Sequence, residues 1–131
     1  MLIRSELDFV AITGTHRWSD AAVGYIMDLY DELGGREWGG FAVVGCAEGI
    51  DEITREIFPR FWEIKAPWEI VGRSAGNVRN GAIAGGVGEL LRRDWRGQGY
   101  AFPDAKSRGT WDCKAKLISV GLPVEVRMIG P

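Results

Sequence analysis

Short apolar runs alternate with amphipathic stretches along this chain. Residues 9–12, 41–44 and 100–102 are continuous apolar runs, typical of strands that are buried on both faces, and the alternating segment V-E-V at 124–126 comes last. Glycine or proline follows each of the first three runs within two residues, as expected where a buried strand ends. The pattern therefore predicts four strands, with longer segments between them for helices.

The first of these segments has clear helix boundaries. Between residues 22 and 33, apolar side chains recur at three- and four-residue spacing, so they form one face of a helix. Ser19 or Asp20 can cap its start, and Gly34 with the glycine after it ends it. A second helix is predicted from Ile50 onward.

Apolar positions define the length of this second helix. Ile50, Ile53, Ile57 and Phe61 follow helical spacing, and Pro59 limits the helix because proline lacks an amide donor and clashes with the preceding turn. A weaker extended segment is predicted at residues 62–66.

The remaining helices are predicted less evenly. Residues 74–92 have helical content, but four glycines from Gly81 onward predict breaks. A helical row of apolar residues runs from Trp111 to Ile118, and Gly121 stands where a helix often has a left-handed glycine after its end.

Strand and helix alternate in the order typical of an α/β fold with a mainly parallel sheet and helices on both faces. One domain over residues 1–131 accounts for the chain. In such a sheet the loops that follow the strands lie at one edge, the carboxyl edge, where ligands bind. Residues 14–19, 45–51 and 103–112 are therefore expected to meet there.

Composition narrows the range of functions. The chain has 131 residues, 46% hydrophobic and 26% charged, which is enough for one core and excludes a disordered tail. The net charge of −2 argues against duplex nucleic acid as a partner, although residues 66–131 alone carry +4. With two cysteines and one histidine, no metal site is expected. No signal peptide or membrane span is evident, so a cytoplasmic protein is expected.

The loop after the first strand, T-G-T-H-R-W, combines Gly14, Thr15, His16 and Arg17. Its backbone amides and the Arg17 guanidinium can bind an anion, but an ordinary turn with a surface arginine explains the sequence equally well. Both interpretations stay open.

The loop after the second strand offers carboxylates beside small residues. Gly45, Ala47 and Gly49 permit close approach of a ligand, and Glu48 or Asp51 can accept hydrogen bonds from ribose hydroxyls. Alternatively, Asp51 only complements the positive end of a helix dipole.

The segment S-R-G-T-W-D before the last helix is the most informative of the three loops. A phosphate there gains first-turn amides, including those of Gly109 and Thr110, and the Thr110 hydroxyl. The alternative is simple helix capping, with Asp112 complementing the dipole. Arg79 and Asn80 form a further polar pair whose alternative is surface exposure.

Together these segments resemble a known family. The segments are ITGTHRWSD (12–20), VGCAEGID (44–51), APW (66–68), SAGNVRN (74–80) and AFPDAKSRGTWDCKAKLISVGLPVEV (101–126). Their order and spacing are similar to the YspA-like branch of the SLOG superfamily. The resemblance implies a Rossmann-like fold with a nucleotide-type ligand at the carboxyl edge and no cofactor. It also implies self-association as a homodimer.

The resemblance assigns residues to the ligand site. They are Gly14, Thr15, Arg17, Gly45, Ala47, Gly49, Asp51, Arg79, Asn80, Gly109, Thr110 and Asp112; Glu48 is added to them from its position in the loop after the second strand. LOG enzymes of the superfamily hydrolyse nucleoside 5′-monophosphates with an arginine and an acid near a P-G-G-x-G-T segment. Here Pro103 is followed by Asp104 and Ala105 instead of two glycines, and Asp104 can repel a phosphate. The acid after Gly-Thr is Asp112, shorter than the glutamate of LOG enzymes.

Three functions follow as hypotheses. The first is binding of a phosphorylated nucleoside or ADP-ribose-like molecule, by a sensor, carrier or sequestering protein. The second is hydrolysis of a nucleotide N-glycosidic bond, with Asp112 stabilising the positive charge on the ribose, Asp51 or Glu48 activating water and Arg79 orienting the phosphate. The third is a DNA-processing accessory module.

Overall fold

A computed structural model describes residues 4–65 and 75–130, and its centre is a five-stranded sheet whose strand pairs are all parallel. The strand order is β3-β2-β1-β4-β5, so the first strand lies in the middle of the sheet. This order confirms the predicted α/β fold with a parallel sheet. The strands are β1 (Phe9–Gly14), β2 (Phe41–Gly45), β3 (Phe61–Ile64), β4 (Gly97–Phe102) and β5 (Val124–Val126).

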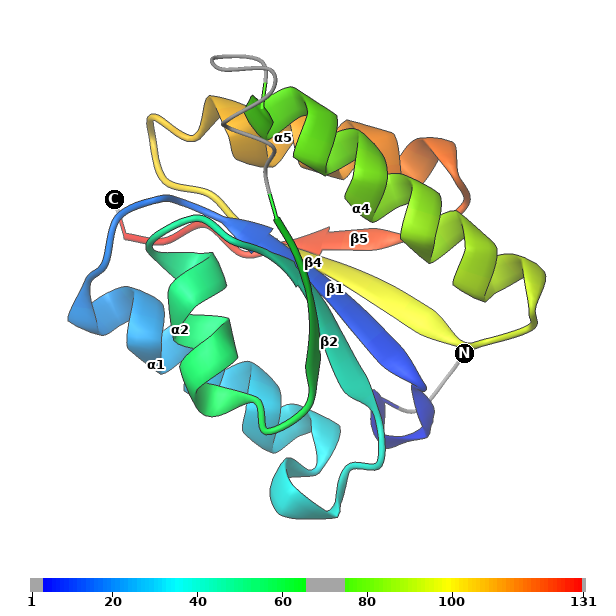
Figure 1. The fold of residues 1–131 in the computed structure, drawn as a ribbon. Coiled ribbons are helices and arrows are strands. Elements are labelled where there is room, and N and C mark those ends of the chain that lie inside the picture. Colours follow the sequence, from blue (N-terminus) through cyan, green and yellow to red (C-terminus); the bar gives the residue numbers. More distant parts are fainter. Residues whose placement is uncertain (1–3, 66–74, 131) are drawn as a thin grey trace.

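Helices cover both faces of this sheet, as Figure 1 shows. The two faces bury separate apolar clusters, one with α1 and α2 and the other with α4 and α5. The helices are α1 (Asp20–Leu33), α2 (Ile50–Ile57), α4 (Ala75–Arg92) and α5 (Arg108–Ser119), with 3-10 turns at Arg4–Glu6 and Gly35–Glu37. None of the helices in the described part of the chain is long and apolar enough to cross a membrane.

The predicted boundaries of α1 and the end of α5 are confirmed. The Ser19 hydroxyl accepts a hydrogen bond from the backbone amide of Ala22 at 3.0 Å, which caps α1. Gly34, with φ +119°, ends α1, and Gly121, with φ +98°, follows α5. Both glycines adopt backbone conformations that other residues rarely take.

Two predictions in the middle of the chain are wrong. Phe61 does not continue the second helix, because α2 ends at Ile57 and Phe61 begins β3. The glycines of α4 do not break it, and the helix runs unbroken over 18 residues. Gly86 allows close packing, since a Cβ there would lie 2.7 Å from the Trp62 ring. This packing offsets the low helix propensity of glycine.

The second half of the chain departs from the pattern in two further places. The strand predicted from Tyr100 begins at Gly97, because the ring of Phe9 covers Gly97 so closely that a Cβ would lie 2.1 Å from it. The apolar row of α5 faces solvent, with Trp111 44% and Ile118 49% exposed. The buried side of α5 consists of Thr110, Cys113 and Leu117.

Candidate functional site

Two hollows adjoin at the carboxyl edge of the sheet. The first, of about 260 Å³, is lined by the loop after β1 and by the segment from Asp104 to Thr110. The second, of about 340 Å³, is lined by the loop after β2 and by Gly76 and Arg79 of α4. His16 lines both hollows, so they are neighbours. The loops that follow β1, β2 and β4 meet at the same end of the sheet in Figure 1.

Glycines hold the first two loops together. A Cβ on Gly49 would lie 2.3 Å from the carbonyl oxygen of Thr15, and one on Gly14 would lie 2.5 Å from Cγ1 of Ile50. The Ile50 amide also donates a hydrogen bond to the Thr15 carbonyl at 3.0 Å. The start of α2 is therefore fixed against the loop after β1, as the parallel topology requires.

Asp51 lies close to Arg79, which lines the second hollow. A Cβ on Gly45 would be 2.7 Å from Oδ2 of Asp51 and 3.1 Å from Nε of Arg79, so both side chains need the glycine. Asp51 accepts a hydrogen bond from the amide of Ala47 at 3.1 Å. Burial raises the pKa of Asp51, while the Arg79 charge and the Ala47 amide oppose this rise. Asp51 thus organises the loop and lies close to Arg79.

Arg79 is the most unusual group of the site. It is 6% exposed, yet among the described residues its buried Nε has no hydrogen-bond partner. An arginine in this condition costs free energy, since buried charged groups are normally paired and fully hydrogen-bonded. Because Arg79 also lines the second hollow, an anionic ligand there would offset part of that cost.

A carboxylate is anchored in the first hollow. Oδ1 of Asp104 accepts hydrogen bonds at 2.9 Å from the amide of Lys106 and from the hydroxyl of Ser107, and Oδ2 accepts one at 2.7 Å from the hydroxyl of Thr15. Led by the Thr15 bond, these contacts lower the pKa of Asp104 to about 2. Nε of Arg17 lies 3.8 Å from Oδ2. The Asp104 carboxylate is therefore ionised at neutral pH.

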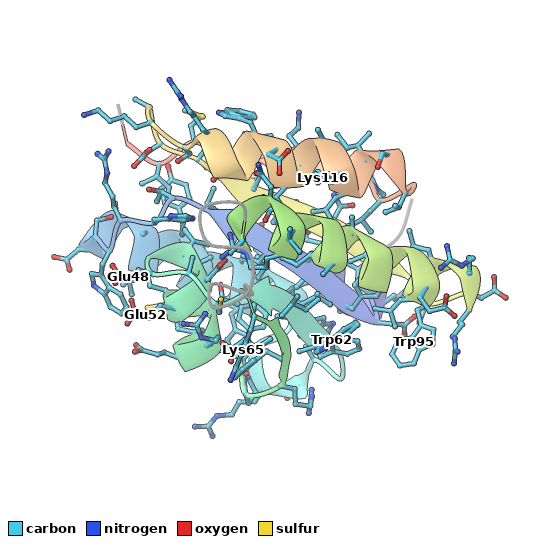
Figure 2. The ribbon with its side chains drawn as sticks, turned by 45° about the horizontal axis from the view of Figure 1, so that its top comes forward. Glu48, Glu52, Trp62, Lys65, Trp95 and Lys116 are labelled. Atoms are coloured by element: carbon cyan, nitrogen blue, oxygen red, sulfur yellow. The ribbon has the colours of Figure 1, made fainter. Side chains whose placement is uncertain are left out.

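Asn80 and Asp112 belong to a contact between α4 and α5. The side-chain amide of Asn80 donates to Asp112 at 2.9 Å and to the carbonyl of Gly109 at 3.3 Å. Lys116, which lies between the two helices in Figure 2, donates to Asp112 at 2.8 Å and to the carbonyl of Asn77 at 3.1 Å. Burial alone would raise the pKa of Asp112, but the Lys116 and Asn80 bonds lower it.

The other residues that the sequence predicted for the site lie around these groups. Gly14, Thr15, Arg17, Gly109 and Thr110 line the first hollow, and Ala47 and Glu48 line the second. Three further residues, Gly45, Gly49 and Asp51, pack behind the lining of the hollows. Neither hollow is lined by Asn80 or Asp112.

The residues predicted for the site did not include Ser107, and Asp104 was considered only as a departure from the family pattern. The spacing P-D-x-x-S after a strand is the available signal, because an aspartate there can accept bonds from the following amide and hydroxyl. The APW segment (66–68) and Ser74, which the resemblance includes, lie outside the described residues.

Comparison with protein-family models finds no match for this chain, and searches of curated proteins and of solved structures find none either. The resemblance to the SLOG superfamily therefore stays a prediction, and the site must be interpreted from its own geometry.

Proposed function

We propose that the two hollows form one binding site for a phosphorylated nucleoside or an ADP-ribose-like molecule, and that the protein acts as a sensor, carrier or sequestering protein. The observation that carries this proposal is Arg79, a buried cation that lines a hollow at the carboxyl edge and whose Nε has no hydrogen-bond partner among the described residues. Arginine suits phosphate because its planar guanidinium matches phosphate oxygens.

The size of the site supports a ligand of more than one group. Each hollow has a volume near the lower end of the range for small-molecule sites, and the shared His16 makes them adjacent. A phosphate can occupy one hollow while a sugar or base occupies the other. Glu48 lines the second hollow and is exposed, so it can accept a hydrogen bond from a ribose hydroxyl.

Gly109 gives independent support. A Cβ on Gly109 would meet no atom within 4 Å, and its φ is not positive, so neither packing nor backbone conformation requires glycine there. It lines the first hollow in the first turn of α5. A ligand that approaches the backbone closely is a reason for glycine at such a position.

The positions of Asp51 and Asp112, the two carboxylates predicted to be catalytic, favour binding over the hydrolysis predicted for them. Asp51 is buried under the site, and Asp112 is held by Asn80 and Lys116 outside the lining of both hollows. Hydrolysis requires a carboxylate that reaches the sugar. Glu48 is the carboxylate of the second hollow that is exposed and can approach a ligand.

The first experiment is a binding and turnover panel on the full chain. Thermal unfolding is measured with AMP, GMP, CMP, UMP and ADP-ribose, and the same mixtures are assayed for free base. We expect stabilisation of about 2.7 kcal/mol at a ligand concentration 100 times the dissociation constant, without base release. Absence of any stabilisation overturns the proposal, while base release that Asp112→Asn abolishes establishes the hydrolase instead.

The second experiment separates ligand contact from stability. Gly109→Ala adds a methyl group to a residue that lines the first hollow, so we expect about tenfold weaker binding with unchanged or slightly higher stability. Gly81→Ala is the matched control, because Gly81 is an exposed helical glycine with no atom within 4 Å of its Cβ position. Equal affinity of the two variants would remove Gly109 from the site.

A further inference from the structure

Asp104 makes the two hollows chemically different. Its side chain is 19% exposed and lines the first hollow, where three hydrogen bonds hold it in one orientation. The second hollow has the buried guanidinium of Arg79 in its wall instead. The first hollow therefore contains a fixed carboxylate in its lining, whereas the second contains a fixed guanidinium in its lining with Asp51 buried next to it.

The cations around the first hollow are not held against Asp104 by hydrogen bonds, so they neutralise its charge less effectively than a fixed ion pair would. The side chain of Arg17 is 59% exposed and its Nε lies 3.8 Å from Oδ2, beyond hydrogen-bond distance. Lys106 and Arg108 are exposed as well. Water and salt screen such exposed charges, whereas the carboxylate acts on a group inside the hollow at short range.

Asp104 still has capacity for one more donor. An ionised carboxylate offers about four acceptor positions, and Lys106, Ser107 and Thr15 use three of them. The Oδ2 atom, with a single hydrogen-bond donor from Thr15, is the oxygen with room left. A hydroxyl group can donate to it, but a phosphate that is fully ionised cannot.

We propose that Asp104 determines the specificity of the site by excluding phosphate from the first hollow and accepting a sugar hydroxyl there, so that the phosphate of the ligand binds beside Arg79 in the second hollow. This inference rests on the proposed function and adds the orientation of the ligand. It replaces the expectation from the sequence that Gly109 and Thr110 hold the phosphate.

Asp104→Asn tests the proposal with little change of shape. The asparagine oxygen can still accept from Lys106 and Ser107, and its NH₂ group can donate to the Thr15 hydroxyl, which then acts as acceptor. Only the charge and the free acceptor are lost. Asp8→Asn is the matched control, because Asp8 also accepts a backbone bond, from Arg96 at 2.7 Å, at the opposite edge of the sheet.

The experiment measures dissociation constants by calorimetry for three probes. These are the monophosphate that binds best in the panel, its nucleoside, and inorganic phosphate. For Asp104→Asn we expect nucleoside binding to weaken and inorganic phosphate binding to strengthen, each by about tenfold, because a charged acceptor is lost and a repulsion is removed. Asp8→Asn should leave all three constants unchanged.

Opposite changes for nucleoside and phosphate are the signature of this proposal. If the monophosphate binds but Asp104→Asn changes neither probe, or changes both in the same direction, the proposal is overturned while the proposed function stands. If no phosphorylated nucleoside binds the wild-type protein or the variant, the proposed function fails and this proposal fails with it. Thermal unfolding of each variant confirms that the compared proteins are folded.

Discussion

The two edges of the sheet are built in different ways. At the amino edge, glycines lie against aromatic rings: a Cβ on Gly97 would be 2.1 Å from the Phe9 ring, and one on Gly40 would be 2.3 Å from the Trp38 ring. The indole of Trp38 is also hydrogen-bonded, donating to the carbonyl of Leu7 at 2.9 Å. This edge gains stability from close apolar packing.

The carboxyl edge instead gathers polar groups that are costly to bury. Among the described residues, the buried polar side chains lie at or just after the carboxyl ends of strands, or at the start and in the first two turns of helices; they are Thr13, Thr15, Asp51, Thr54, Arg79, Asn80, Ser107 and Thr110. Packing alone does not explain this distribution, since buried polar groups cost free energy unless they are paired. One edge therefore stabilises the fold, and the other carries the candidate site.

The largest expected effect tests how tightly the carboxyl edge is built. Gly49→Ala combines a backbone φ of +71° with a Cβ placed 2.3 Å from the Thr15 carbonyl oxygen, so we expect a loss of roughly 3–5 kcal/mol of unfolding free energy. Chemical denaturation measures it. Gly35→Ala is the control, because Gly35 has φ +58° and open space around its Cβ position, and it should lose only the backbone part. Equal losses would show that the contact with Thr15 is unimportant.

A smaller effect is expected from the amino edge, and it should leave the site intact. Gly97→Ala pushes a methyl group into the buried Phe9 ring, which should destabilise the protein by about 1–3 kcal/mol. The affinity of the folded protein for the monophosphate should not change. Phe9→Leu in the same chain should restore part of the lost stability, and a double variant no more stable than Gly97→Ala alone would argue against the clash.

Asp104 should stabilise the carboxyl edge in a pH-dependent way. Its folded pKa of about 2 lies below the reference value of 3.8, so the contribution is complete above the reference value and disappears as pH falls toward 2. We expect Asp104→Asn to cost about 1–2 kcal/mol at pH 7, less than the full shift implies because the carboxylate is partly exposed. Denaturation at pH 7, 5 and 3.5 measures the difference from wild type. A difference that does not shrink at pH 3.5 would contradict this assignment.

The sequence predicted the layers of the fold and the edge of the sheet that carries the candidate site, but not the role of each polar side chain there. Buried strands can be recognised as apolar runs, so β1 and β2 were predicted nearly to the residue. The parallel topology then predicted that the loops after these strands lie at the same edge of the sheet. The start of β4 was missed because Gly97 and Gly99 have low strand propensity. Glycine is needed at these two positions because they lie against Phe9 and Val124, and these contacts exist only in the folded protein.

The site shows the same limit at the level of side chains. Loop position predicted Asp51 as a site residue, and the family resemblance predicted Arg79. No spacing reveals that Nε of Arg79 is buried without a partner among the described residues, or that Asp51 supports the loop. The hydrogen bonds of Asp112 depend on where α4 packs against α5, which periodicity does not specify. Local sequence patterns thus predict the strands, the helices and the sheet topology, whereas the roles of polar groups depend on contacts between segments that are distant in the sequence.

The smallest expected effect concerns the exposed face of α5, which the periodicity of the sequence does not distinguish from a buried one. Because Trp111 and Ile118 both face solvent, Ile118→Ser should change the unfolding free energy by no more than about 0.5 kcal/mol. Leu117→Ser, one residue away and fully buried, is the matched control and should cost several times more. If Ile118→Ser were as destabilising as Leu117→Ser at every protein concentration, α5 would be packed with the face from Trp111 to Ile118 inward, contrary to the structure described here. A loss that grew with protein concentration would instead show that a second copy covers this face.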